Sequence, residues 1–238
     1  MIDKRIHYCW FGGKDLPNEA KECLNSWRKY CSDYEIIEWN ETNIDLTEND
    51  YIREAYEEKK WAFITDYVRL KVLYENGGIY MDTDVEVLKP LDEFLMHEAF
   101  SGFEDIDCVP TGIMACEKGN PVIKELLDYY KDKHFIMPDG TYDMTTNVVT
   151  ITKYFKNKGL LMNNTFQCID GFYFYPKDYF CPKDHATGKI VCTNNTHTIH
   201  HFSGSWHTPY QKMKAKLKKI IGSRLTEKIL ILKHKLFK

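Results

Sequence analysis

Two aspartates separated by one residue, Asp82 and Asp84, are the acidic pair in this sequence with the clearest chemical setting. Such a triplet arises about once by chance in a chain of this kind, and Asp105-Ile106-Asp107 is a second one. The first follows Gly77-Gly78 and the apolar run Ile79-Tyr80-Met81, which predicts a buried strand that ends at the acids. Because open α/β sheets bind ligands beyond the carboxyl ends of their strands, this pair is a candidate site.

The chemistry that such a pair can support is metal binding. Two carboxylates one residue apart supply the oxygen ligands that Mg²⁺ and Mn²⁺ prefer. A divalent cation held there can bridge the phosphates of a nucleoside diphosphate and stabilise the charge that builds up as this group leaves. We therefore predict that Asp82 and Asp84 bind Mn²⁺ or Mg²⁺; a turn capped by aspartate is the alternative interpretation.

The pattern around the acids predicts an α/β fold. Residues 61–76 show the strongest helical periodicity, and the double glycine after them fits a left-handed helix end. Residues 5–10 and 34–39 have strand character and enclose a helix that begins after Pro17, as in a βαβ unit. Further strands are expected at 85–88, 99–103, 112–116, within 166–180 and at 196–201, and further helices from about 51, at 121–130 and at 145–155.

The chain as a whole has the composition of a folded globular protein. Its 238 residues are 43% hydrophobic and 28% charged, which suits one large domain. The eight cysteines form no CxxC pair, no secretory leader is recognisable, and no apolar run approaches the roughly 20 residues of a membrane helix. We expect a reduced, cytoplasmic protein whose catalytic domain covers residues 1–210.

Residues 211–238 differ from the rest of the chain in charge. They carry ten Lys or Arg and one acid, Glu227, so their net charge is +9 while the remainder carries −12. Their leucines and isoleucines recur at helical spacing, which predicts a basic amphipathic tail. Such a helix can lie on an anionic membrane surface, which would make the protein peripheral on the inner face, or it can dock on the core. Nucleic acid is not an expected partner, because the charge is terminal and lacks interleaved aromatic residues.

Four motifs occur in a characteristic order: Ile6–Gly12, Ala62–Arg69, Tyr74–Asp84 and His201–Trp206. Together they resemble glycosyltransferase family 32, the DXD sugar-binding-region glycosyltransferases of the capsular polysaccharide synthesis type, over most of residues 4–206. The resemblance implies a GT-A type, Rossmann-like domain. It also implies a nucleotide-sugar donor, a divalent metal, and transfer with retention of anomeric configuration.

The resemblance assigns roles outside the acidic pair. Asp66 and Arg69 share one helix face and are implied to hold the donor's hydroxyls and diphosphate; an exposed i,i+3 ion pair is the alternative. His201 is implied as a further metal ligand, and Trp206 as an indole that reaches the glycosidic oxygen or the phosphate. Strand alternation sends neighbouring side chains to opposite faces, so only one of His200 and His201 should face the metal. A core histidine is the alternative for either.

The expected donor site includes an aromatic wall. Trp10 is predicted to stack on the nucleotide base, although packing in the core would also explain it. Residues 109–114 lie where the family forms a donor or acceptor wall, and 145–147 could cap a helix or contact the acceptor. The predicted donor-binding residues are Trp10, Asp66, Arg69, Tyr80, Asp82, Thr83, Ser205 and Trp206, and the predicted catalytic residues are Asp66, Arg69, Asp82, Asp84 and Trp206.

The functional hypothesis is transfer of a hexose from a nucleotide sugar, such as UDP-galactose, UDP-glucose or an N-acetylated analogue. The expected acceptor is a hydroxyl of a bacterial surface glycan or lipid-linked oligosaccharide, as in capsular, exo- or lipopolysaccharide. A glycoside hydrolase, which needs two carboxyl groups flanking the bond, and a non-catalytic glycan-binding protein are the alternatives.

Overall fold

The computed structural model describes residues 1–104, 108–109, 111–185 and 187–204. The predicted tail at 211–238, the domain boundary at 210, and the candidates Ser205 and Trp206 lie outside these residues. Among the residues described, no helix combines the length and the apolar character of a membrane span.

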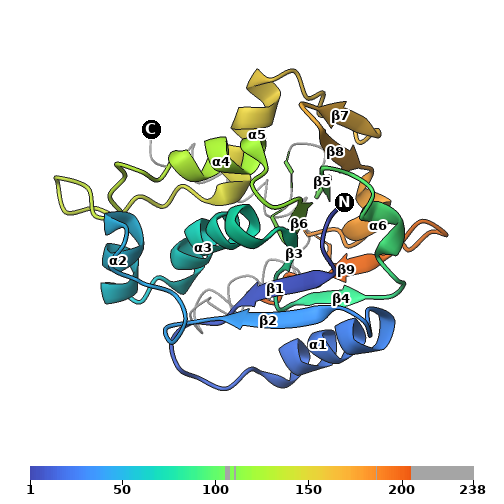
Figure 1. Cartoon of the computed structure of the whole chain (residues 1–238), viewed down its shortest axis with the longest axis horizontal. Helices are drawn as coiled ribbons and strands as arrows, with labels where there is room; N and C mark the ends of the chain where they lie inside the picture. The colour runs from blue at the N-terminus through green and yellow to red at the C-terminus, as the bar shows by residue number, and fades with distance from the viewer. Residues whose placement is uncertain (105–107, 110, 186, 205–238) are drawn as a thin grey trace, which may run out of the picture.

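A seven-stranded mixed sheet forms the centre of the molecule, in the order β2-β1-β3-β6-β5-β8-β7 (Figure 1). The β2-β1-β3 part is parallel, β6 runs antiparallel to both β3 and β5, and β5 is parallel to β8. The predicted α/β fold is therefore confirmed. The strands of this sheet are β1 (Arg5–Cys9), β2 (Glu35–Trp39), β3 (Gly78–Met81), β5 (Ala99–Gly102), β6 (Ile113–Cys116), β7 (Gln167–Ile169) and β8 (Phe172–Tyr175), and a separate antiparallel pair comprises β4 (Val85–Val87) and β9 (Thr198–His200).

Helices cover both faces of the sheet, and each face has its own hydrophobic core. Successive residues of β3 point to opposite cores: Ile79 and Met81 pack with α1, whereas Tyr80 packs with α3. Burial on both faces explains why this strand is a short apolar run without polar alternation. The helices are α1 (Asn18–Tyr30), α2 (Asp50–Glu57), α3 (Trp61–Asn76), α4 (Pro121–Asp128), α5 (Asn147–Asn157) and α6 (Lys177–Phe180), with a 3-10 helix, η1 (Asp92–Phe94).

The Gly77-Gly78 pair sets the direction of β3. Gly77 has φ 68° and ψ −165°, a conformation essentially limited to glycine, so the predicted left-handed helix end is replaced by a more extended turn. A Cβ at Gly77 would lie 2.7 Å from the backbone nitrogen of Lys118, and one at Gly78 would lie 2.9 Å from the carbonyl oxygen of Arg5. The two glycines thus allow β3 to begin directly after α3 and to end at Asp82.

Candidate functional site

The acidic pair lies in a turn between β3 and β4. The Asp82 amide donates to the Gly112 carbonyl at 2.9 Å, so the chain stays bound to the segment that enters β6 even after β3 has ended. The Val85 amide then donates to the Asp82 carbonyl at 3.0 Å and closes the turn. Because β4 pairs with β9 with Val85 opposite His200, the turn is brought against the end of β9.

One carboxylate oxygen each from Asp82 and Asp84 and one ring nitrogen of His200 all lie within 4.8 Å of one another. The His200 Nε2 atom is 3.2 Å from Asp84 Oδ1 and 3.9 Å from Asp82 Oδ2. The other Asp84 oxygen, Oδ2, accepts a hydrogen bond of 2.7 Å from the Ser203 amide. Asp84 Oδ1 is buried and has no hydrogen-bond partner, because the contact with His200 is an ion pair without hydrogen-bond geometry.

This arrangement corrects the predicted histidine ligand. His201 points away from the acids, and its Nε2 atom is 2.8 Å from Glu86 Oε2. Only its backbone amide reaches the site, where it donates to the Asp84 carbonyl at 2.9 Å. Side chains alternate along β9, so only one of the two histidines can face the carboxylates. That histidine is His200, not His201.

Arg69 lies fully inside the protein next to the acidic pair, and its side chain is 6% exposed. Its Nη2 atom is 3.5 Å from Asp66 Oδ1 and 3.4 Å from Asp82 Oδ1. Its Nη1 atom donates to the Thr111 carbonyl at 2.5 Å, and its guanidinium carbon lies 4.6 Å from the centre of the Tyr80 ring. The predicted i,i+3 pair is therefore a buried network and not an exposed ion pair.

Asp66 connects this network to α5. Its Oδ2 atom accepts a hydrogen bond of 3.0 Å from the Asn147 amide, and its carbonyl accepts one of 2.6 Å from the Asn147 side chain. The Asn147 Oδ1 atom in turn accepts from the Tyr130 hydroxyl at 2.6 Å. Asn147 thus uses its amide, its side-chain nitrogen and its side-chain oxygen to fix the start of α5 against α3.

Burial and charge shift the protonation equilibria of these groups in different directions. Burial raises the pKa of Asp66 to about 6, although Arg69 and the Asn147 amide act against it. Burial also disfavours the Asp84 carboxylate, but the His200 charge and the Ser203 amide outweigh it and lower the pKa of Asp84. For His200, burial favours the neutral ring, yet the adjacent carboxylates dominate and raise its pKa. Near neutral pH, Asp66, Asp84 and His200 are therefore charged.

The remaining predicted residues occupy several environments. Trp10 follows β1, which runs parallel to β3, so it lies at the same edge of the sheet as the acids; it is half-buried, and its indole N–H donates to the Lys14 carbonyl. Thr83 is half-buried between the two acids. Tyr80 is 1% exposed, and its hydroxyl donates to Asp82 Oδ1 at 2.8 Å, so its contact is with the carboxylate.

Gly112 is a site residue that sequence reasoning did not single out. A Cβ at this position would lie 2.8 Å from His200 Nδ1 and 2.9 Å from its Cε1 atom. The close approach of the imidazole therefore requires glycine. The sequence predicts that residues 109–114 form a wall of the site, but it contains no signal for a contact between residues 112 and 200.

The comparisons with known proteins agree with the resemblance found in the sequence. Residues 17–101, from before α1 through both acids to β5, match the family described as "Glycosyltransferase sugar-binding region containing DXD motif". This match covers a little over a third of the chain and confirms the resemblance to this family. The mixed sheet with its parallel β2-β1-β3 part is the α/β architecture that this resemblance implied.

Similar proteins occur in several kinds of organism. One is Subversion of eukaryotic traffic protein A of Legionella pneumophila, 26% identical over 54% of this chain and 25% of that protein, so this chain spans only about a quarter of its length. Another is uncharacterized glycosyltransferase L373 of Acanthamoeba polyphaga mimivirus, 26% identical over 82% of both chains. Among solved structures, a glycosyltransferase involved in glycosylation of the major capsid of PBCV-1 superposes with a TM-score of 0.49 and 12% identity, over 90% of this chain and 98% of that one.

Proposed function

Because this chain carries the DXD sugar-binding region of the glycosyltransferases, we propose that it is a metal-dependent, retaining hexosyltransferase. The proposed donor is a UDP-hexose, namely UDP-galactose, UDP-glucose or an N-acetylated analogue. The proposed acceptor is a hydroxyl of a bacterial surface glycan or of a lipid-linked oligosaccharide. The observation that supports this proposal best is the group of Asp82, Asp84 and His200 at the carboxyl end of β3.

The three side chains suit a divalent cation. Asp84 Oδ1 is a buried, charged oxygen without a hydrogen-bond partner, and a cation would satisfy it. Once His200 gives up its ring proton to the arriving cation, two carboxylates and one imidazole form a donor set that suits Mn²⁺ better than Mg²⁺, because Mg²⁺ strongly prefers oxygen ligands. Bound there, the cation would neutralise the negative charge that develops on the nucleoside diphosphate.

Arg69 and Asp66 contribute mainly by positioning in this proposal. The Arg69 guanidinium is already engaged by the Thr111 carbonyl and by two carboxylates, one of them Asp82. It therefore fixes the orientation of Asp82, and Asp66 fixes Arg69 while also joining α3 to α5. The donor-binding roles of Trp10 and Thr83 remain part of the proposal, and no side chain is assigned as a covalent nucleophile.

The proposal extends to where the protein acts. An acceptor that is carried on lipid would place the enzyme at the inner face of the membrane, and the basic segment 211–238 would favour an anionic surface. Removal of this segment should release the protein from vesicles that contain anionic phospholipid while metal-dependent hydrolysis of the donor continues. Loss of folding would instead mean that the segment belongs to the core.

The central test is a panel of nucleotide sugars with and without Mn²⁺. UDP-glucose, UDP-galactose, UDP-N-acetylglucosamine and GDP-mannose should be compared by thermal stabilisation of the protein and by slow release of nucleotide. One UDP-sugar is expected to raise the melting temperature only when Mn²⁺ is present. In the Asp84→Asn and Asp82→Asn variants, nucleotide release should fall by at least about 100-fold, because a bound metal contributes several kcal/mol of charge stabilisation.

Matched controls separate the cluster from general effects of charge. Asp132 is exposed, so Asp132→Asn should leave release unchanged. His200→Gln should reduce Mn²⁺ affinity, whereas His201→Gln, at the neighbouring residue paired with Glu86, should not. Cleavage of an aryl glycoside without any use of nucleotide sugars would favour a glycoside hydrolase. Nucleotide release that persists at full rate in Asp84→Asn would contradict the metal-dependent mechanism.

A further inference from the structure

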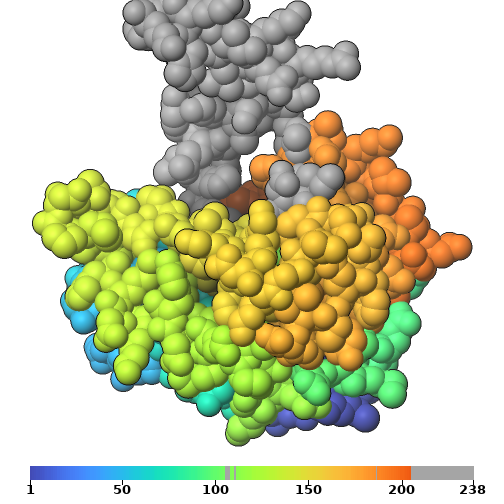
Figure 2. All heavy atoms as spheres, turned by 90° about the horizontal axis from the view of Figure 1, so that it is seen from above, coloured from blue at the N-terminus to red at the C-terminus, as the bar shows by residue number. Residues whose placement is uncertain are grey.

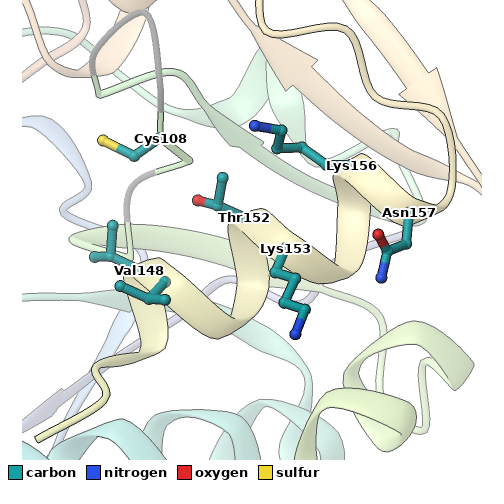
Figure 3. Close-up of a pocket in the computed structure, with 7 residues that line it drawn as sticks. Cys108, Val148, Thr152, Lys153, Lys156 and Asn157 are labelled. Carbon is teal, nitrogen blue, oxygen red and sulfur yellow. The ribbon is translucent and has the colours of Figure 1, made fainter.

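A surface pocket lies along α5, the helix whose first residue, Asn147, binds Asp66. Its volume is about 360 Å³, and it is formed by α5 and the chain that follows β5 (Figure 3). The segment around α5 is also on the surface in the view of Figure 2. The residues that line the pocket are Cys108, Val148, Val149, Thr152, Lys153, Lys156 and Asn157.

The pocket concentrates positive charge that nothing in the described part of the protein neutralises. Lys153 and Lys156 are exposed and have no acidic partner among the described residues. Lys158, on the same segment but outside the pocket, differs because it pairs with Asp170 at 3.2 Å. Among the described residues, therefore, no acid competes with an anionic ligand for the two lysines that line the pocket.

The walls of the pocket are firm and partly apolar. Thr152 is 8% exposed, and its hydroxyl accepts a hydrogen bond of 3.0 Å from the Val109 amide, which ties α5 to the chain after β5. Val148 and Val149 supply an apolar surface against which the C–H face of a sugar ring can pack. A sugar that carries a carboxylate or a phosphate would match both features.

The position of the pocket relates it to the acceptor. Helix α5 begins at Asn147, which binds Asp66, and a helix rises about 1.5 Å per residue, so Lys153 and Lys156 lie about 9 and 13 Å further along it. If the reacting hydroxyl of an acceptor lies near Asp82 and Asp84, the next residues of that acceptor could extend along α5 toward these lysines.

We propose that the α5 pocket binds an anionic group, a carboxylate or a phosphate, carried by the acceptor glycan. The pocket would then select acidic over neutral acceptors. This inference rests on the proposed transferase function, because it assumes that a glycan acceptor binds near Asp82 and Asp84.

The test measures binding directly, so it does not depend on turnover. The protein is titrated with methyl glucoside, methyl glucuronide and glucose 6-phosphate, and its NMR chemical shifts are followed. The two anionic probes should bind about three- to tenfold more tightly than the neutral one, and this preference should shrink in high salt. Comparison of the two anionic probes distinguishes a carboxylate from a phosphate.

Two double variants locate the effect. Lys153→Gln with Lys156→Gln should abolish the preference for the anionic probes. Lys21→Gln with Lys131→Gln removes the same charge from exposed positions on α1 and after α4, and should keep the preference. Equal binding of all three probes, no binding of any, or a preference that survives in the pocket variant would overturn the proposal. Nucleotide release by the wild-type protein, measured in parallel, reports separately on the transferase function.

Discussion

Two corners of the candidate site each place aspartates against a basic side chain, but the polar atoms of the two corners differ in whether they have partners. In one corner, the carboxylates of Asp66 and Asp82 are balanced by Arg69, a permanent cation held inside the protein. In the other, Asp84 faces His200, and Asp84 Oδ1 and His200 Nδ1 are buried without hydrogen-bond partners. The positive charge of Arg69 in the first corner is permanent, whereas His200 in the second can lose its proton, and the buried atoms there can still bind a ligand.

This difference suggests that the Arg69 corner positions Asp82 and the His200 corner binds the cation. A complete, buried ionic network has one low-energy arrangement, so it can hold Asp82 in a fixed place. A network with unpartnered buried atoms is stabilised when a cation binds to those atoms, so it can serve as a binding site. Asp82 belongs to both corners, since one of its oxygens faces Arg69 and the other faces His200. Changes at the Arg69 corner should therefore alter folding first, and changes at the His200 corner should alter metal affinity first.

The largest effect is expected from Arg69→Gln. It leaves two buried carboxylates without their cation, and breaking such a buried pair costs about 3–5 kcal/mol. Denaturant unfolding in the presence of EDTA should record this loss. Arg53→Gln is the matched control, because Arg53 is 39% exposed where it pairs with Asp50, and its loss should cost less than about 1 kcal/mol. Equal losses in the two variants would remove the distinction between a positioning corner and a binding corner.

The pH dependence of stability tests the same corner without removing its cation. Burial raises the pKa of Asp66 to about 6, so the folded state holds this proton over a range in which the unfolded state has already lost it. The contribution of Asp66 to stability is therefore fullest below about pH 4 and declines as the pH rises to about 6, by up to about 3 kcal/mol.

Asp66→Asn should lose this pH dependence. Its amide oxygen can still accept the hydrogen bond from the Asn147 backbone, so the contact with α5 is kept. In EDTA, the stability of the variant relative to wild type should rise between about pH 4 and pH 6 and then level off. A difference that stays constant over this range would mean that Asp66 titrates as an ordinary exposed carboxyl.

Gly112→Ala tests the binding corner. The new methyl group would meet the His200 ring at 2.8 Å, so the imidazole must move away from the acids. Displacing a ligand in this way should weaken Mn²⁺ binding by about 10- to 100-fold, as changes around metal ligands commonly do. Calorimetric titration with Mn²⁺ measures it. Gly140→Ala, where nothing lies within 4 Å of the new Cβ, should not change the affinity even though its positive φ makes alanine strained.

The sequence predicted the local parts of this site well. The apolar strand, the end of the helix at the glycine pair and the spacing of Asp66 and Arg69 on one helix are short-range patterns, and the structure has all three. These features depend on residues within about two turns or one strand of one another, where periodicity and turn chemistry decide the outcome.

The long-range parts could not be predicted from these patterns. The choice between His200 and His201 depends on how β9 pairs with β4, more than 100 residues earlier in the chain. The contact of Asn147 with Asp66 joins residues 81 apart, and it decides that the Asp66–Arg69 pair is buried and not exposed. Spacing along the chain carries no information on such pairings. The side of a helix or strand on which a residue lies was therefore predictable, and the distant residue that it contacts was not.

The smallest effect is expected from Tyr80→Phe. This variant changes the contacts of Asp82 on the Arg69 side and leaves those on the His200 side unchanged. The ring beneath Arg69 is kept, and only the hydroxyl that donates to Asp82 Oδ1 at 2.8 Å is lost. One such hydrogen bond contributes about 1 kcal/mol, so unfolding in EDTA should show a loss of this size. Mn²⁺ affinity should change by no more than about threefold, because Asp82 Oδ2, the oxygen on the His200 side, keeps its place. A much larger loss of affinity would mean that Tyr80, and not Arg69, is the main group that orients Asp82 for the metal.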